Sequence, residues 1–123
     1  MNAEKTINVE ALVAEAESSE HKEAYTTLNR AANFRIGIGA RIASPNRPSF
    51  FIEILIHLSH DSNEADLHVL EKSLALLKAL QARGFKTVFQ GDNWVSCEAQ
   101  VSNENLTTEY EWATSLVQSV FVG

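Results

Sequence analysis

Residues 34–42, FRIGIGARI, alternate strictly between apolar side chains and charged or small ones. A period of two residues is typical of a β-strand with one buried face. Residues 50–58, FFIEILIHL, alternate in the same way after the loop sequence SPNRP, so the two segments predict a hairpin. The side chains expected on its buried face are Phe34, Ile36, Ile38, Ala40 and Ile42 from the first strand, and Phe50, Ile52, Ile54, Ile56 and Leu58 from the second.

A second hairpin is predicted from residues 85–90 and 94–101, on either side of a turn that contains GDN. A two-residue loop would place Phe85 and Phe89 on the same face of the hairpin as Ser96 and Glu98. A three-residue loop of residues 91–93 instead gathers the apolar side chains, and we prefer it because a one-residue slip inverts every side chain. The residues then expected on the buried face are Phe85, Thr87, Phe89, Val95, Cys97, Ala99 and Val101.

Three segments have helical periodicity. Residues 8–31 are predicted to form either one helix with a polar centre or two short helices that meet near Ser18 and Ser19. A second helix is expected from about Asp61, with Glu64 completing a capping box, to about Arg83. Gly84 would end it as a Schellman stop, with Phe85 packing back on Leu80. Residues 104–121 form the third, with an apolar stripe of Leu106, Tyr110, Ala113, Leu116, Val117, Val120 and Phe121.

The predicted order is therefore α-β-β-α-β-β-α in a single α+β domain spanning residues 1–123. A four-stranded, mainly antiparallel sheet with helices packed on one face is the natural two-layer assembly. This order of elements resembles the small acidic secretion-chaperone-like fold, whose members dimerise and bind other proteins.

Composition limits the classes of partner. The chain is 45% apolar and 21% charged, with a formal net charge of −6, and its acidic N-terminal segment has no signal-like apolar run. With one cysteine and no stretch long enough to cross a bilayer, we expect a cytoplasmic protein without a membrane partner. Nucleic acid is disfavoured because the average field repels phosphate, although Phe51 and Trp94 would suit base stacking.

The outward-facing row of the first hairpin contains the glycine–arginine stripe. If Ile42 pairs near Phe50, this row sets Arg41 opposite Phe51, Gly39 opposite Glu53, Gly37 opposite Leu55 and Arg35 opposite His57. Two glycines at alternate positions clear a groove for a helix, a second subunit or a ligand. In the simpler interpretation, Phe51 and Leu55 lean over the gap or the glycines permit a bulge.

The leading hypothesis is a non-enzymatic protein that acts through this outer face, by self-association, by binding another protein, or by both. The alternative is a small anionic ligand held by Arg35 or Arg41, with Glu53 and His57 available for proton transfer. The N-terminal helix could also cover part of the face. The predicted binding residues are Arg35, Gly37, Gly39, Arg41, Phe51, Glu53, Leu55, His57 and Trp94.

No metal, cofactor or catalytic residue is predicted. His57, His60 and His68 fall on a strand, a turn and a helix, so their spacing gives no compact ligand set. The G-x-G of residues 37–39 lacks the third glycine of a dinucleotide site. Cys97 faces the predicted core, where a free cysteine is normally inert.

Overall fold

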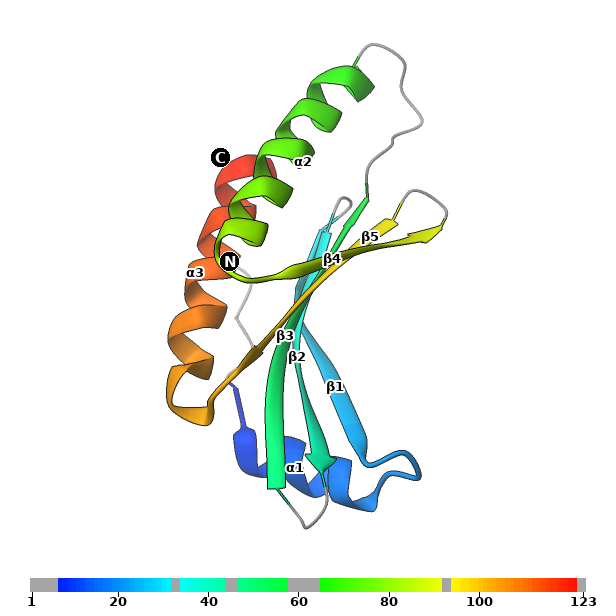
Figure 1. Ribbon diagram of the computed structural model, residues 1–123, viewed down its shortest axis with the longest axis vertical. Helices are drawn as coiled ribbons and strands as arrows, with labels where there is room; N and C mark the ends of the chain where they lie inside the picture. The colour runs from blue at the N-terminus through cyan, green and yellow to red at the C-terminus, as the bar shows by residue number, and fades with distance from the viewer. Residues whose placement is uncertain (1–6, 32–33, 44–46, 58–64, 92–93, 122–123) are drawn as a thin grey trace.

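The computed structural model describes residues 7–31, 34–43, 47–57, 65–91 and 94–121, with only the backbone described for residues 65–69. These residues form three α-helices and a five-stranded antiparallel sheet (Figure 1). Along the chain the elements are α1 (Val9–Ser18), β1 (Glu23–Arg30), β2 (Phe34–Ala43), β3 (Arg47–His57), α2 (Ala65–Ala82), β4 (Lys86–Gly91), β5 (Trp94–Val101), the short 3-10 helix η1 (Asn103–Asn105) and α3 (Leu106–Phe121).

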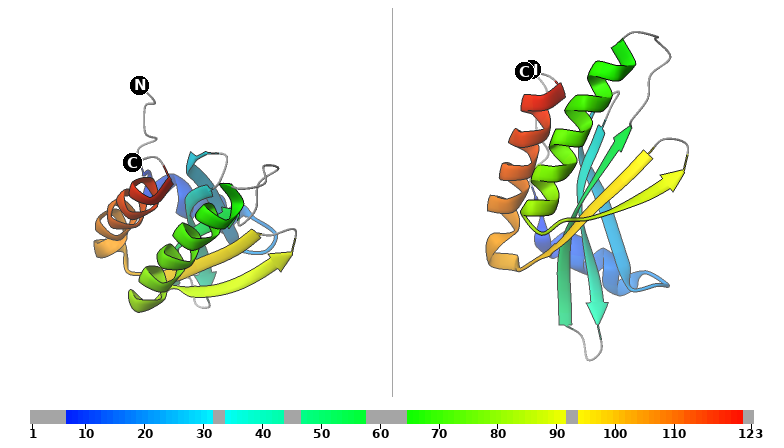
Figure 2. Two further views of the ribbon diagram at one scale, coloured as in Figure 1. Left: turned by 90° about the horizontal axis from the view of Figure 1, so that it is seen from above. Right: turned by 45° about the horizontal axis from the view of Figure 1, so that its top comes forward.

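The strands are ordered β1-β2-β3-β5-β4, so the two predicted hairpins lie side by side and β1 adds an edge strand. The α+β class is confirmed, but the prediction of four strands is wrong. Figures 1 and 2 show α2 and α3 next to each other on one side of the sheet and α1 across its lower end. Residues of all three helices join one hydrophobic core with the isoleucine row of the sheet.

The segment 8–31 was predicted to be helical throughout, and this is wrong for its second half. The side chain of Asn8 accepts a hydrogen bond from the backbone N–H of Ala11 at 3.0 Å and caps α1, which ends at Ser18. Lys22 then adopts a positive φ of 56°, and the chain turns into β1. β1 begins as a regular strand because Ala24 and Thr26 alternate inward, and β-branched threonine favours extended backbone.

The first hairpin has the predicted faces. Ile36, Ile38, Ile52 and Ile54 are buried on the inner side of the sheet. Its register differs by two residues from the prediction, because β3 begins at Arg47 and Ile42 pairs with Pro48. β5 pairs with β3 only from Phe50 onward, so Pro48 lies where β3 is still a sheet edge and needs no second ladder partner.

The second hairpin has the predicted register over most of its length, with Phe89 paired to Val95 and Thr87 to Cys97. Its end differs from the predicted three-residue loop, because a bulge between Phe89 and Gly91 pairs Gly91 with Trp94 and makes Gly91 part of β4. Val95 and Cys97 are buried as expected. Phe89 was predicted to be buried and is instead 75% exposed, because it lies near the open end of the edge strand β4. The alternation of apolar and polar residues correctly predicts that Phe89 points to the helix side of the sheet. It does not predict how much of that side the helices cover.

Helix α2 stops as predicted. Gly84 has a φ of +106°, the N–H of Phe85 donates to the carbonyl of Leu80 at 3.0 Å, and that of Gly84 donates to the carbonyl of Gln81 at 3.0 Å. This is the Schellman pattern, which needs a residue tolerant of positive φ. The proposed cap at residues 61–64 lies outside the described residues. The predicted stripe of the C-terminal helix packs into the core through α3.

Candidate binding surface on the outer sheet face

The outer face of the sheet carries the odd-numbered side chains of β2 and β3 and is opposite the helices. Leu12 and Ala16 of α1 are buried in the core with Ile38, so α1 lies on the inner face. None of the three described helices covers the outer face. The alternative in which the N-terminal helix covers part of this face is therefore excluded for the residues that the structure describes.

The gap left by the two glycines is filled from within the chain. A methyl group added to Gly39 would overlap the ring of Phe51, and one added to Gly37 would overlap the backbone carbonyl of Thr26 and the hydroxyl of Tyr25. Tyr25 and Phe51 come from the strands on either side of β2, and their rings stack at 6.4 Å between centroids. Phe51 leans over the gap, as the simpler interpretation predicted, and is only 3% exposed.

Arg41 closes one end of this aromatic pair. Its guanidinium carbon lies 4.0 Å from the centroid of the Phe51 ring. The guanidinium donates to both carboxylate oxygens of Glu98, at 2.9 and 3.2 Å, and to Glu23 at 3.1 Å. Two carboxylates thus more than balance its charge, so this arginine has little capacity left for an external anion.

The other end of the outer face is a cluster around Trp94. The rings of His57 and Trp94 are 4.7 Å apart, and the guanidinium of Arg35 lies 5.5 Å from the Trp94 ring. Arg35 is exposed and makes no ion pair with any residue that the structure describes. A depression of about 440 Å³ adjoins this cluster; Arg35, Glu53, Leu55, Gln90, Gly91 and Trp94 line it.

Glu53 forms the acidic wall of that depression. Ser96 donates a hydrogen bond to its carboxylate at 3.2 Å. Partial burial raises the pKa of Glu53; the Ser96 hydrogen bond opposes this and the negative charge of Glu98 adds to it. Burial, with a contribution from the Glu53 charge, also raises the pKa of Tyr25 to about 12. The surroundings at the centre of the face therefore disfavour the ionised forms of Glu53 and Tyr25.

The structure divides the predicted binding residues into two groups. Gly37, Gly39, Arg41 and Phe51 form a closed aromatic and ionic layer, whereas Arg35, Glu53, Leu55, His57 and Trp94 surround or adjoin the open depression. Sequence reasoning missed Tyr25 and Ser96. Tyr25 was assigned to a helix, and Ser96 gave no signal beyond its place on the outward row.

The described residues offer neither a cluster of metal-binding side chains nor a reactive thiol. No group of three or more His, Cys, Asp or Glu side chains among the described residues could hold a metal ion. Of the three histidines discussed above, His60 and the side chain of His68 lie outside the described residues. Cys97 is fully buried, and burial, together with the Glu53 charge, raises the pKa of its thiol to about 12.

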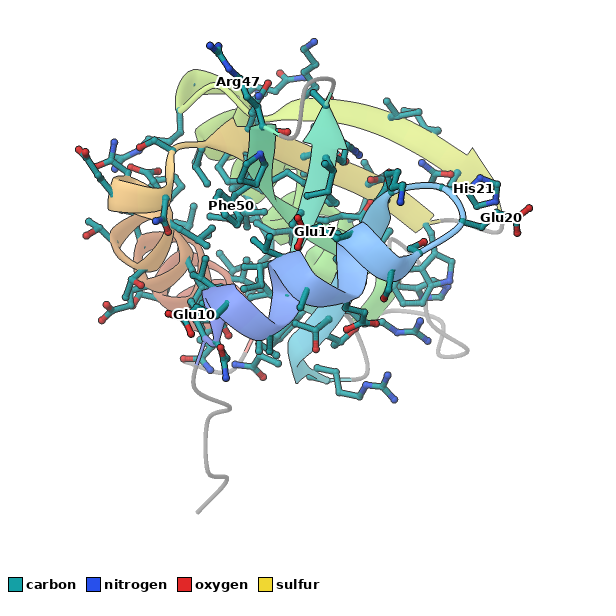
Figure 3. The ribbon with its side chains drawn as sticks, turned by 90° about the horizontal axis from the view of Figure 1, so that it is seen from below. Glu10, Glu17, Glu20, His21, Arg47 and Phe50 are labelled. Carbon is teal, nitrogen blue, oxygen red and sulfur yellow. The ribbon has the colours of Figure 1, made fainter. Side chains whose placement is uncertain are left out.

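A second hollow, of about 870 Å³, lies on the helix side, between the start of α1 and the ends of β3 and β5. Phe50 points into the interior there, while Glu10 lies on α1 at its rim and Arg47 points away (Figure 3). Its lining is apolar at Val9 and Val13 and includes no cation. It was not predicted from the sequence.

Comparisons of the chain with protein-family models, with curated proteins and with solved structures found no match. Within the described residues, no helix has both the length and the apolar character needed to cross a membrane. The class that the fold defines is an α+β protein whose five-stranded antiparallel sheet carries its helices on one face.

Proposed function

We propose that this chain is a non-enzymatic protein that binds another polypeptide through the outer face of its sheet, with Trp94 and Arg35 as the main contacts. The observation that supports this most strongly is the Trp94 cluster beside an open depression, on a face that no described helix covers. Tryptophan and arginine are the residue types most enriched among the side chains that dominate binding energy at protein interfaces.

The arrangement of the two groups also favours a protein partner. The layer of Tyr25, Phe51 and Arg41 is rigid because its rings stack and its arginine is held by two carboxylates. A rigid surface loses little conformational entropy on binding. The depression beside it has both a cationic wall at Arg35 and an acidic wall at Glu53, which suits a partner with mixed polarity.

The alternative of a small anionic ligand is less well supported. Of its two proposed arginines, Arg41 is already neutralised by Glu23 and Glu98. The remaining candidate, Arg35, shares its depression with the carboxylate of Glu53, which repels an anion.

The test is site-specific photo-crosslinking in the cells that make the protein. A photoreactive amino acid replaces Leu55 beside the depression, and in a control it replaces Arg47, which lies at the far end of the same face of β3. We expect a crosslinked polypeptide at position 55 that is absent at position 47. The partner, once identified and purified, is then titrated against the variants.

The charge reversal Arg35→Glu and the truncation Trp94→Ala should each weaken binding at least about tenfold, as expected for central contacts. Arg47→Glu makes the same charge change on the same face and should leave binding within about twofold. Equal effects of Arg35→Glu and Arg47→Glu, or no crosslinked product at position 55, would contradict the proposal. Stabilisation by an anionic metabolite that Arg35→Glu abolishes would instead support the ligand alternative.

A further inference from the structure

The large apolar side chains that are most exposed within the described residues all lie on two neighbouring elements, α2 and β4. They are Leu70 at 37%, Leu74 at 49%, Val88 at 55% and Phe89 at 75% exposed. We call these four residues the α2–β4 surface. Val88 pairs with Ser96 and therefore points to the outer face of the sheet, whereas Phe89 points to the side on which α2 lies. Clustered exposed apolar side chains normally have a partner.

The helix and the strand present this surface together. Leu70 and Leu74 lie one helical turn apart, and Gln81 lies two turns further along the same side of α2. The side chain of Gln81 donates a hydrogen bond to Thr87 on β4 at 2.7 Å, so that side of α2 faces the strand. Thr87 and Phe89 share one face of β4, so Phe89 points to the same side of the sheet as α2.

β4 is also a free edge of the sheet. Its one strand neighbour within the described residues is β5, which leaves a row of backbone N–H and C=O groups on its other side. Both edge strands contain a bulge, β1 between Thr27 and Asn29 and β4 between Phe89 and Gly91, near its end. The two edges differ in their exposed apolar side chains, because Val88 and Phe89 lie on β4 and none of the four lies on β1. An edge strand with exposed apolar side chains favours pairing with another strand.

We propose that a second copy of this chain occupies the α2–β4 surface, with the two β4 strands paired antiparallel about a two-fold axis. The sequence of β4 suits such self-pairing. When Val88 lies on the axis, Thr87 of one copy faces Phe89 of the other, and Lys86 faces Gln90, which lies at the bulge of β4. A two-fold symmetric interface uses the same surface on both copies, so that surface must be complementary to itself. This register meets the requirement because it places no like charges opposite each other.

The same axis brings the two α2 helices together in antiparallel orientation, because α2 lies beside β4 on the inner face of the sheet. A crossing centred next to Leu74 places Leu70 and Leu74 of both copies in the contact. It also sets the exposed Glu71 of one helix opposite the exposed Lys78 of the other, twice by symmetry. Apolar residues at the centre with complementary charges at the rim are typical of a protein interface.

The resulting dimer would join the two sheets into one and leave both outer faces on the same side. Gln90 also lines the depression of the proposed partner surface, but Arg35 and Trp94, the main contacts proposed there, take no part in the dimer. The dimer and the partner site can therefore fail independently.

The test measures the oligomeric state of the full chain by light scattering during size-exclusion chromatography, from low to high micromolar concentration. The wild type should be a dimer, and Leu74→Lys and Phe89→Asp should each shift it to a monomer with an unchanged circular dichroism spectrum. Glu71→Lys should raise the dimer dissociation constant at least about tenfold, and adding Lys78→Glu should restore it. Trp94→Ala, on the outer face, should remain a dimer.

A crosslink checks the axis without weakening the fold. Val88→Cys should form a disulfide-linked dimer under mild oxidation, because residues on a two-fold axis approach their own copies, whereas Lys86→Cys should not. A wild type that stays monomeric at high micromolar concentration would overturn the proposal. So would a dimer that Leu74→Lys and Phe89→Asp leave intact and that Val88→Cys fails to crosslink.

Discussion

The ring of Phe51 on β3 occupies the space in which a side chain at Gly39 on β2 would lie. The two residues are directly paired across the strands. Because Gly39 has no side chain, the Phe51 ring can pack directly against the backbone of β2. Phe51 is therefore buried although it is on the outward row of its strand. The outer face is consequently filled by aromatic side chains at this end, whereas beside Trp94 it has an open depression.

The Phe51–Gly39 contact predicts a strong dependence of one substitution on the other. Gly39→Ala should lower the free energy of unfolding by about 1–3 kcal/mol, because the added methyl group overpacks the ring. In a Phe51→Ala background the same change should cost at least about 1 kcal/mol less, as expected for residues in contact. A double-mutant cycle measured by urea unfolding checks this, and additive effects would contradict the packing described here.

Gly37→Ala should be at least as damaging as Gly39→Ala. The methyl group at position 37 would meet the backbone carbonyl of Thr26 as well as the Tyr25 hydroxyl, and backbone moves less readily than a ring. We expect loss of amide protection along β1 in hydrogen exchange, with β3 and β5 unaffected. Uniform loss of protection, or none, would contradict a local clash at β1.

Arg41 should contribute to stability through its combined contacts with Phe51, Glu23 and Glu98. Because its side chain is 43% exposed, we expect Arg41→Ala to cost only about 1 kcal/mol. Arg47→Ala on the same face serves as the control and should change stability by less than about 0.5 kcal/mol. Thermal unfolding at low and high salt measures both, and the Arg41 effect should decrease at high salt.

Glu53 should make the protein less stable as the pH rises. Its pKa is raised in the folded state, so the native carboxyl binds its proton more tightly than the unfolded one does. Its contribution therefore falls as the pH rises from the unfolded pKa through the folded pKa. Glu53→Gln should melt at a higher temperature than the wild type at pH 7, and the difference should shrink in acid. A wild type that is the more stable of the two at pH 7 would contradict this sign.

Cys97 should be inert in the native protein. It is fully buried, and the pKa of its thiol is raised to about 12, so the thiolate is scarce at ordinary pH. At pH 8 we expect an aromatic disulfide reagent to react with it only as fast as the protein unfolds, and at once in denaturant. Rapid labelling under native conditions would show that the core around β5 opens locally.

The sequence predicts the faces of the first hairpin well because a period of two residues is unambiguous over its isoleucine rows. The second hairpin follows once the loop length is chosen so that its apolar side chains share one face. The sequence fails to predict β1 because Ala24, Tyr25 and Leu28 also fit a helical spacing. The strand preference of Thr26 and Thr27 between them is too weak to exclude a helix from local pattern alone. The register of the first hairpin is shifted because Pro48 was expected to end the ladder. A proline at a locally unpaired strand end is tolerated, and that depends on where β5 stops.

The candidate site is also predictable in part, because the two-residue period of the strands assigns side chains to one face or the other. The parity of the strands identifies which residues face outward, so Arg35, Leu55 and Trp94 were correctly expected on one face. The closing of the glycine gap by Tyr25 depends on a strand that was not foreseen. The exposure of Phe89 depends on the path of α2, which local pattern does not encode.

The most direct test of the outer-face proposal is hydroxyl-radical footprinting of the protein in a native extract and after purification. Trp94 and His57 should be oxidised several-fold less in the extract, where the partner covers them, while the half-buried Trp112 on α3 should react equally in both samples. Equal oxidation of Trp94 in the two samples would show that its face is bare in the cell and would contradict the proposed function.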